Sequence, residues 1–190
     1  QYRSMEKFGI AVFEIFERKV SRLKEFKVQT EVDSIQLTGA QQKAYDNVKA
    51  GFEENKPVLL HGVTSSGKTE IYIKLINEAI AQGKQVLYLL PEIALTAQII
   101  NRLKEYFGDK LGVYLSRYGN NERVEVWEQV RDFGQTQSSK HQIIIGSRSA
   151  IFLPYSDIGL IIVDEEHDSS FKQIELAPRY NARDAAIVLA

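Results

Sequence analysis

The sequence contains no cysteine and only three histidines. Without thiolates, this segment can form neither a disulfide framework nor a cysteine-ligated zinc site. The histidines are scattered along the chain, so they do not supply a zinc site either. We therefore expect no zinc in this segment.

Long hydrophobic runs are also absent. The apolar stretches are far shorter than the roughly 20 residues that a membrane-spanning helix needs. Residues 1–8 lack the apolar centre of a signal peptide. We therefore expect a cytoplasmic protein with no membrane contact. Position 1 is not methionine and residues 185–190 are apolar, so we also expect an excised fragment.

The sequence also lacks a clear excess of positive or negative side chains. The chain has 24 Lys and Arg against 25 Asp and Glu, a formal net charge of -1. A global basic field, which alone can drive non-specific nucleic-acid binding, is therefore excluded. Any contact with DNA has to be local.

The length and apolar content favour one main domain with an appendage: 190 residues, of which 44% are hydrophobic. Residues 1–36 combine an apolar segment with a charged one, and we predict a linker or the tail of a preceding DNA-binding domain. From residue 37 to residue 190, short apolar runs alternate with helix-like stretches.

This alternation predicts an α/β fold of three layers around a mostly parallel sheet, because continuous apolar strands suit a sheet covered on both faces. The predicted strands are residues 58–60, 86–90, 113–115, 143–145 and 160–163. The predicted helices are residues 40–54, 68–81, 95–107 and 122–133. A glycine follows each of the last three helices, as is usual at helix ends.

A glycine- and serine-rich loop lies between the first predicted strand and a predicted helix. It matches the Walker A pattern G-x-x-x-x-G-K-T, and its predicted nucleotide-binding residues are Gly62, Val63, Thr64, Ser65, Ser66, Gly67, Lys68 and Thr69. Backbone N–H groups of such a P-loop turn toward phosphates, which the positive end of the helix also attracts. Lys68 would contact the β- and γ-phosphates of ATP, and the Thr69 hydroxyl would bind Mg²⁺. The alternative is a chance loop with a solvated lysine.

Two adjacent carboxylates follow the last predicted strand. Parallel sheets bind ligands at the carboxyl ends of their strands. We predict that Asp164 holds Mg²⁺ together with Thr69, and that Glu165 orients and deprotonates the attacking water. The alternative is an acidic helix start. His167 could sense the γ-phosphate or could simply be a polar residue at a helix start.

These two motifs, the second reading Asp-Glu-Glu-His, resemble those of the DExH helicases of superfamily 2, also called the DEAH-box type. Residues 37–41 resemble the upstream glutamine motif, which implies that Gln41 reads adenine. Residues 89–96 resemble motif Ia, and residues 146–152 resemble a Gly-Thr-Arg-Ser-Ala stretch. Residues 164–173 and 179–184 closely resemble the PriA family of primosomal replication-restart DNA helicases.

The resemblance implies a RecA-like P-loop domain, the first of two helicase lobes. It also implies 3′ to 5′ translocation on single-stranded or forked DNA, driven by Mg-ATP hydrolysis, in replication restart and primosome assembly. The implied partners are a second lobe in cis, primosome proteins and single-strand-binding proteins. Since the second lobe supplies an arginine finger, this segment alone is expected to hydrolyse ATP poorly.

The DNA-facing residues also come from the resemblance: Thr96, Ser147, Arg148 and Ser149. Their hydroxyls and cation suit contact with a DNA backbone, although Ser and Thr more often cap helices and turns. A loop that couples DNA binding to hydrolysis is implied for Phe171, Lys172, Arg179, Tyr180 and Arg183. Its aromatic rings could stack on bases or could simply pack on the domain.

The chain departs from its relatives at three positions. Leu115 stands where a histidine is common, Asn181 where another histidine is frequent, and Ser65 where the P-loop usually has glycine. Ser65 occupies a free position of the pattern, so we expect little effect there. Trp127 has helical spacing with Val124 and with residues 130–131, and we interpret it as a packing residue.

Two other classes of function fit part of the pattern. One is a P-loop ATPase that does not act on DNA, such as a small-molecule kinase or a transporter ATPase. The acidic motif and residues 171–184 argue against it. The other is a nucleotide-gated docking module for primosome proteins, whose role would survive the loss of hydrolysis.

Overall fold

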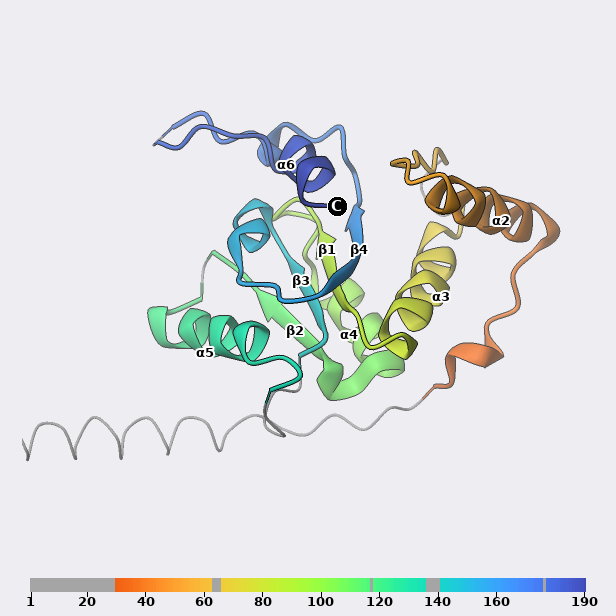
Figure 1. The fold of residues 1–190 in the computed structure, drawn as a ribbon, viewed down its shortest axis with the longest axis horizontal. Helices are drawn as coiled ribbons and strands as arrows, with labels where there is room; N and C mark the ends of the chain where they lie inside the picture. The colour runs from red at the N-terminus through yellow and green to blue at the C-terminus, as the bar shows by residue number, and fades with distance from the viewer. Residues whose placement is uncertain (1–29, 63–65, 117, 136–140, 176) are drawn as a thin grey trace, which may run out of the picture.

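The computed structural model describes residues 30–62, 66–116, 118–135, 141–175 and 177–190 (Figure 1). The strands are β1 Gln85–Leu89, β2 Leu111–Tyr114, β3 Ile143–Gly146 and β4 Ile158–Val163. The α-helices are α2 Gly39–Glu53, α3 Lys68–Ala81, α4 Ala97–Phe107, α5 Asn120–Arg131 and α6 Ala182–Leu189. Short 3-10 helices are η1 Val32–Ser34, η2 Gly108–Lys110, η3 Arg148–Phe152 and η4 Ser169–Phe171.

The strands form one parallel sheet in the order β2-β3-β1-β4. β1 lies in the interior, where Leu87 is in register with Ile144 of β3 and Ile161 of β4. Every residue of β1 and β3 is buried, as their continuous apolar runs predict for strands covered on both faces. Because the strands are parallel, the loops after them all leave from one edge of the sheet.

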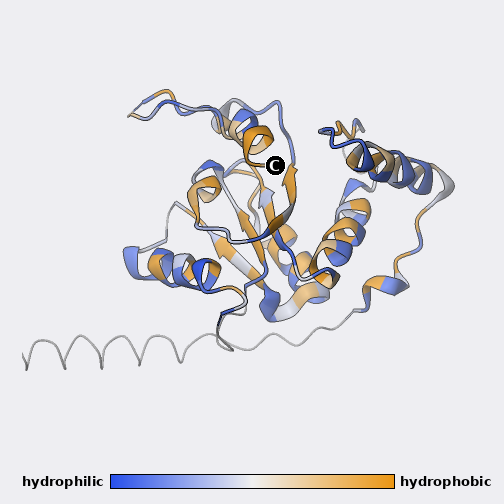
Figure 2. Ribbon diagram, in the orientation of Figure 1, coloured by the Kyte–Doolittle hydropathy of each residue, from blue (hydrophilic) through white to orange (hydrophobic). Residues whose placement is uncertain are grey.

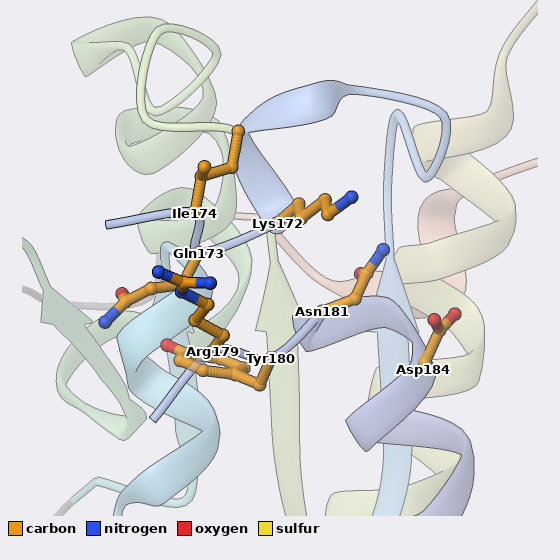
Figure 3. A pocket seen from close by; sticks show the side chains of 7 residues that line it. All are labelled: Lys172, Gln173, Ile174, Arg179, Tyr180, Asn181 and Asp184. Atoms are coloured by element: carbon orange, nitrogen blue, oxygen red, sulfur yellow. The ribbon is translucent and has the colours of Figure 1, made fainter. Parts of the chain in front are cut away.

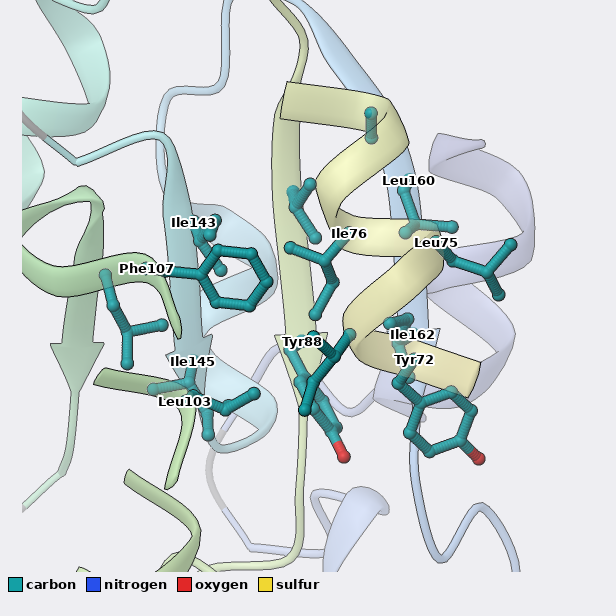
Figure 4. Packing of buried hydrophobic residues seen from close by; sticks show 14 of the residues in the cluster. Tyr72, Leu75, Ile76, Tyr88, Leu103, Phe107, Ile143, Ile145, Leu160 and Ile162 are labelled. Carbon is teal, nitrogen blue, oxygen red and sulfur yellow. The ribbon is translucent and has the colours of Figure 1, made fainter. Parts of the chain in front are cut away.

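Helices cover both faces of the sheet, so the predicted three layers are present (Figure 1). Alternate residues of β1 point to opposite faces. Val86 and Tyr88 pack with α3 and α4, as Figure 4 shows for Tyr88. Leu87 and Leu89 pack with α5, α6 and η3. Figure 2 shows the same division, with apolar strands between helices whose outer faces are hydrophilic.

The helix ends follow the local sequence. Thr38 and Gln41 form a capping box at the start of α2, where each side chain accepts the other residue's backbone N–H. Helix α3 has the predicted bounds and begins after Gly67, which has a φ of 80°. Past the ends of α3 and α5, Gly83 and Gly134 also adopt positive φ, which confirms the predicted glycine stops.

The strand predicted at residues 58–60 is wrong for this structure. The segment is not part of the sheet, and Leu59 is 71% exposed. The chain turns back after α2, where the Lys56 N–H donates to the Gly51 carbonyl, and this places the Val58 side chain against Gly51. An apolar run forms a strand only where a neighbouring strand pairs with its backbone.

Residues 1–29, the larger part of the predicted linker, lie outside the described residues. The remainder of that segment packs on the domain: Ile35 is buried in the core on the α3 side, and the Thr30 N–H donates to the Glu105 carbonyl of α4. Among the described residues, no helix has the length and apolar character needed to cross a bilayer.

Candidate functional site

The acidic motif lies at the carboxyl edge of the sheet. The Asp164 N–H donates to the Leu89 carbonyl at 3.0 Å, which continues the pairing of β4 with β1 by one residue. Glu165 then adopts a left-handed conformation with a φ of 52°. For a residue other than glycine this conformation costs on the order of 1–3 kcal/mol, and such strain gathers at functional sites. The turn is closed by the Asp168 N–H, which donates to the Glu165 carbonyl.

Both oxygens of the Asp164 carboxylate accept hydrogen bonds. The Tyr88 phenol donates to Oδ2 at 2.9 Å, and the Glu165 N–H donates to Oδ1 at 3.1 Å. Burial raises the pKa of the Tyr88 phenol well above its usual range, and the negative charge of Asp164 raises it further. Burial and then the charge of Asp164 raise the pKa of Tyr72 in the same way. Both phenols therefore remain protonated at neutral pH.

Part of the P-loop is described. Val63, Thr64 and Ser65 lie outside the described residues, whereas Gly62, Ser66 and Gly67 lie within them. The Lys68 ammonium donates to the Gly62 carbonyl at 3.1 Å, so it lies over the loop. Thr69 occupies the first turn of α3 and is partly exposed.

The start of α3 and the acidic motif lie at the same edge of the sheet. Tyr72 follows Lys68 by one helical turn, and its phenol lies close enough to Asp164 for that charge to raise its pKa. The Tyr72 ring also contacts Tyr88 edge to face, with centroids 5.7 Å apart (Figure 4). Helix α3 therefore brings Lys68 and Thr69 toward the carboxylate that follows β4.

Gln41 joins the P-loop to α2. Its side-chain carbonyl accepts the Thr38 N–H at 2.8 Å, and its side-chain NH₂ donates to the Gly67 carbonyl at 3.1 Å. Gly67 leaves room for this contact, since a Cβ there would lie 2.0 Å from Gln41 Nε2. The residue predicted to read adenine thus lies beside the glycine that precedes α3.

These groups fit Mg-ATP. The Asp164 carboxylate and the Thr69 hydroxyl are hard oxygen ligands of the kind that Mg²⁺ prefers. The Lys68 ammonium and the amino-terminal end of α3 provide positive charge for phosphates. Gly67 keeps the backbone free of a side chain at the point where the loop enters the helix.

The predicted DNA-facing residues follow two other strands. Thr96 directly precedes α4 and is exposed, and its side chain makes no capping hydrogen bond. Ser147 is buried after β3, and Ser149 is partly buried. Arg148 donates to the Ser170 carbonyl at 3.1 Å, which ties the loop after β3 to the loop after β4.

The predicted coupling loop lines a pocket at this end of the molecule (Figure 3). The Gln173 N–H donates to the Tyr180 carbonyl at 2.8 Å, and Lys172 pairs with Asn181 in an antiparallel bridge, so residues 172–173 lie beside residues 180–181. Lys172, Arg179 and Tyr180 border the pocket. The Tyr180 ring also packs edge to face on Phe152, with centroids 4.8 Å apart.

Two members of the predicted coupling loop have structural partners. Phe171 is 1% exposed and belongs to the core beneath α6, so base stacking by Phe171 is wrong for this structure. A phenylalanine gains more from that apolar position than from solvent. Arg183 forms ion pairs with Glu166 at 3.1 Å and Asp184 at 2.9 Å.

The departures from the family pattern have local explanations. Leu115 is buried in the core on the α3 side. Asn181 caps α6, and its side chain accepts the Arg183 N–H at 3.0 Å. Trp127 is 40% exposed, so it packs against the Arg131 guanidinium and not in the core. Helix α5 contributes Val126 to the core instead.

Several residues near the site escaped the sequence analysis. Tyr88 lies within an aliphatic strand and was counted only as apolar, although a buried phenol needs a hydrogen-bond partner. Glu70 and Arg102 form an ion pair between α3 and α4 that sequence spacing alone does not reveal. His167, which the sequence analysis did name, is largely exposed, and its Nε2 lies 3.8 Å from Glu165 Oε2.

Comparison with known proteins identifies the family. Residues 38–182 match the family model described as DEAD/DEAH box helicase. Replication restart protein PriA of Synechocystis sp. is 42% identical over 97% of this chain and 21% of its own length. The protein of the same name from Bacillus subtilis is 40% identical over 85% of this chain and 19% of its own length. That of Haemophilus influenzae is 50% identical over 70% of this chain and 17% of its own length.

The fold has a relative among solved structures. RecG, in its structure bound to a three-way DNA junction, superposes with a TM-score of 0.55 at 20% identity, covering 78% of this chain and 19% of RecG. This likeness confirms the predicted RecA-like fold. The chain spans about a fifth of the length of the curated relatives named above. With the family model matched over residues 38–182, the chain belongs to the DEAD/DEAH box helicase family.

Proposed function

We propose that this chain is the ATP-binding lobe of an ATP-dependent DNA helicase that moves 3′ to 5′ on single-stranded DNA. Family membership supports the class of activity. The observation that carries the proposal is a pair of contacts: Asp164 accepts the Tyr88 phenol, and the Tyr88 ring contacts Tyr72, one turn after Lys68 in α3. A nucleotide held by the start of α3 would present its phosphates to the acidic motif.

The residues of the site divide the chemistry. Lys68 and the P-loop amides hold the phosphates, and Gln41 reads the adenine. Thr69 and Asp164 would hold Mg²⁺, and the metal would supply positive charge to neutralise the phosphates. Glu165 orients the attacking water and accepts its proton. The Glu165 side chain is exposed at the turn after Asp164, where water can reach it.

We assign DNA contact to Thr96, Arg148 and Ser149, and we leave out Ser147 because it is buried. These groups lie after β1 and β3 and suit a backbone contact that does not read sequence. The pocket bordered by Lys172 and Tyr180 lies after β4. A DNA strand that crosses these loops would therefore also reach the acidic motif. The structurally similar RecG was solved bound to a three-way DNA junction. We propose branched DNA as the substrate class.

The wider setting of the proposal comes from the names of the relatives, which are replication restart proteins. We place the activity in replication restart and primosome assembly in the cytoplasm. The partners are a second helicase lobe in cis, primosome proteins and single-strand-binding proteins. For residues 1–36 we propose a linker or the tail of a preceding DNA-binding domain, with Thr30 and Ile35 packed on the lobe at 37–190.

ATPase measurements on the full-length protein test the proposal. ATP hydrolysis is expected to rise when single-stranded DNA is added, and Lys68→Ala is expected to abolish the rise. Lys74→Ala, a change further along the same helix, serves as the matched control and should keep the wild-type response. An ATP hydrolysis rate that does not change when DNA is added would favour a P-loop ATPase that does not act on DNA.

A further inference from the structure

Tyr88 is a buried polar group beside the proposed metal site. It lies in β1 between aliphatic residues and is 0% exposed. Its hydroxyl reaches the carboxyl edge of the sheet and donates to Asp164 Oδ2 at 2.9 Å. A hydrogen bond between a neutral donor and a carboxylate is stronger than one between two neutral groups. Tyr88 therefore has a defined partner at the strand end where the acidic motif begins.

The surroundings hold the phenol in one place. The Tyr72 ring contacts the Tyr88 ring edge to face at an interplanar angle of 77°. Tyr72 belongs to α3, Tyr88 to β1 and Asp164 follows β4, so the contact joins three elements of the site. Figure 4 shows both hydroxyls directed to the same end of the sheet. The rigid sheet thus fixes the donor, and the donor fixes the carboxylate.

The second oxygen of Asp164 is held as well, by the Glu165 N–H at 3.1 Å. With at least one donor on each oxygen, the carboxylate has little freedom to rotate. A carboxylate accepts about four hydrogen bonds or metal contacts, so Asp164 keeps some capacity to accept another. The side chain is therefore oriented and remains able to bind a cation or its water shell.

We propose that Tyr88 is a positioning residue, which orients Asp164 for Mg²⁺ through the phenol–carboxylate hydrogen bond. This inference rests on the proposed function, in which Asp164 holds the metal of Mg-ATP. Two effects of the phenol oppose each other: it withdraws some charge from the carboxylate, and it orders the carboxylate in advance. Outer-shell partners of metal ligands typically contribute about 10- to 100-fold to metal affinity when both effects are included. We therefore expect the ordering of the Asp164 carboxylate to affect metal affinity more than the withdrawal of charge does.

Metal binding to the full-length protein tests this without measuring hydrolysis. Mn²⁺, which takes the same oxygen ligands and is visible by electron paramagnetic resonance, is titrated into the protein in the presence of ADP. Tyr88→Phe removes only the hydroxyl, and it is expected to weaken Mn²⁺ binding about tenfold. ADP affinity without metal should stay at the wild-type value, because the phenol contacts the metal ligand and not the P-loop.

Tyr155→Phe is the matched control. The Tyr155 phenol donates to the Ala150 carbonyl at 3.1 Å and packs with the core on the opposite face of the sheet. It should leave Mn²⁺ binding unchanged. Tyr88→Met also lacks the hydroxyl and replaces the phenylalanine variant if that protein is recovered unfolded.

The outcomes separate the two claims. Wild-type protein that binds no Mn²⁺ with ADP, beyond what ADP binds alone, would overturn the proposed function and this inference with it. Wild-type binding that is equally strong in Tyr88→Phe would overturn the inference alone. Equal weakening in Tyr155→Phe would also overturn it, because the loss would then reflect general destabilisation.

Discussion

Gln85 shows how a single polar side chain can organise this core. It is 1% exposed in an otherwise apolar region. Its NH₂ group donates to the Val130 carbonyl of α5 at 3.1 Å, while its side-chain oxygen accepts the N–H groups of Ser156 at 2.8 Å and Asp157 at 3.1 Å. One amide thus joins the start of β1, the end of α5 and the turn before β4.

Replacing this side chain tests its contribution. Gln85→Leu keeps the volume but leaves the Val130 carbonyl and two backbone N–H groups without their partner. The Val130 carbonyl is buried, whereas Ser156 and Asp157 are exposed and their N–H groups can bond to water, so we expect a loss of about 1–2 kcal/mol in the free energy of unfolding. Urea denaturation measures it. Gln98→Leu, an exposed position on α4, is the control and should change little; equal losses would contradict the role of the amide.

Residues of this kind mark the limit of sequence analysis. Gln85 and Tyr88 lie in a strand whose apolar pattern was recognised, but their hydrogen-bond partners come from 45 or more positions away. Asp164 and Lys68 were predicted because their motifs are local, and the motifs contain the strand end and the helix start that place them. A partner chosen by tertiary packing leaves no such local signal.

At the scale of helices and strands, the two glycines Gly39 and Gly67 are opposite cases. Gly39 is the first residue of α2, and a Cβ there would meet no atom within 4 Å. Gly67 precedes α3 with a φ of 80°, and a Cβ there would meet the Gln41 amide. Alanine fits a helical conformation but pays a steric penalty in the left-handed one.

The same substitution is therefore expected to have opposite effects at these two helix starts. Gly39→Ala should stabilise the fold by about 0.4–1 kcal/mol, because it restricts the unfolded chain. Gly67→Ala should destabilise it by about 1–2 kcal/mol and weaken nucleotide binding as the P-loop shifts. Thermal unfolding of both variants measures whether each substitution raises or lowers the stability of the fold. A stabilised Gly67→Ala protein would show that the left-handed turn is not required.

The sequence predicted all four strands of the sheet and helices α2 to α5, but it did not predict α6. The glycine stops and the Thr38 capping box define helix ends locally, and α3 matches its predicted bounds. The apolar run at residues 58–60 predicted a strand that the structure does not contain, because pairing depends on where α2 directs the chain. Trp127 likewise has helical spacing with apolar residues, yet α5 turns a different face to the sheet. Local patterns define an element but not its neighbours.

At the scale of the molecule, the chain covers about a fifth of its relatives, and the proposed site uses one lobe of a two-lobe enzyme. The isolated 190-residue chain is expected to bind ATP but to hydrolyse it about a thousandfold more slowly than the full-length protein with DNA, since an arginine finger contributes roughly 10³–10⁵ in rate. Turnover assays on both proteins measure this ratio. A Lys68→Ala version of the isolated chain corrects for contaminating ATPase, and comparable rates would refute the need for a second lobe.

The sheet ends at β4, and within the described residues no strand lies on its outer side. The amide and carbonyl groups along that rim can accept an added extended segment. A segment joining in parallel there would deliver its own following loop next to Asp164. A segment that extends the sheet at this edge would therefore also place residues beside the acidic motif.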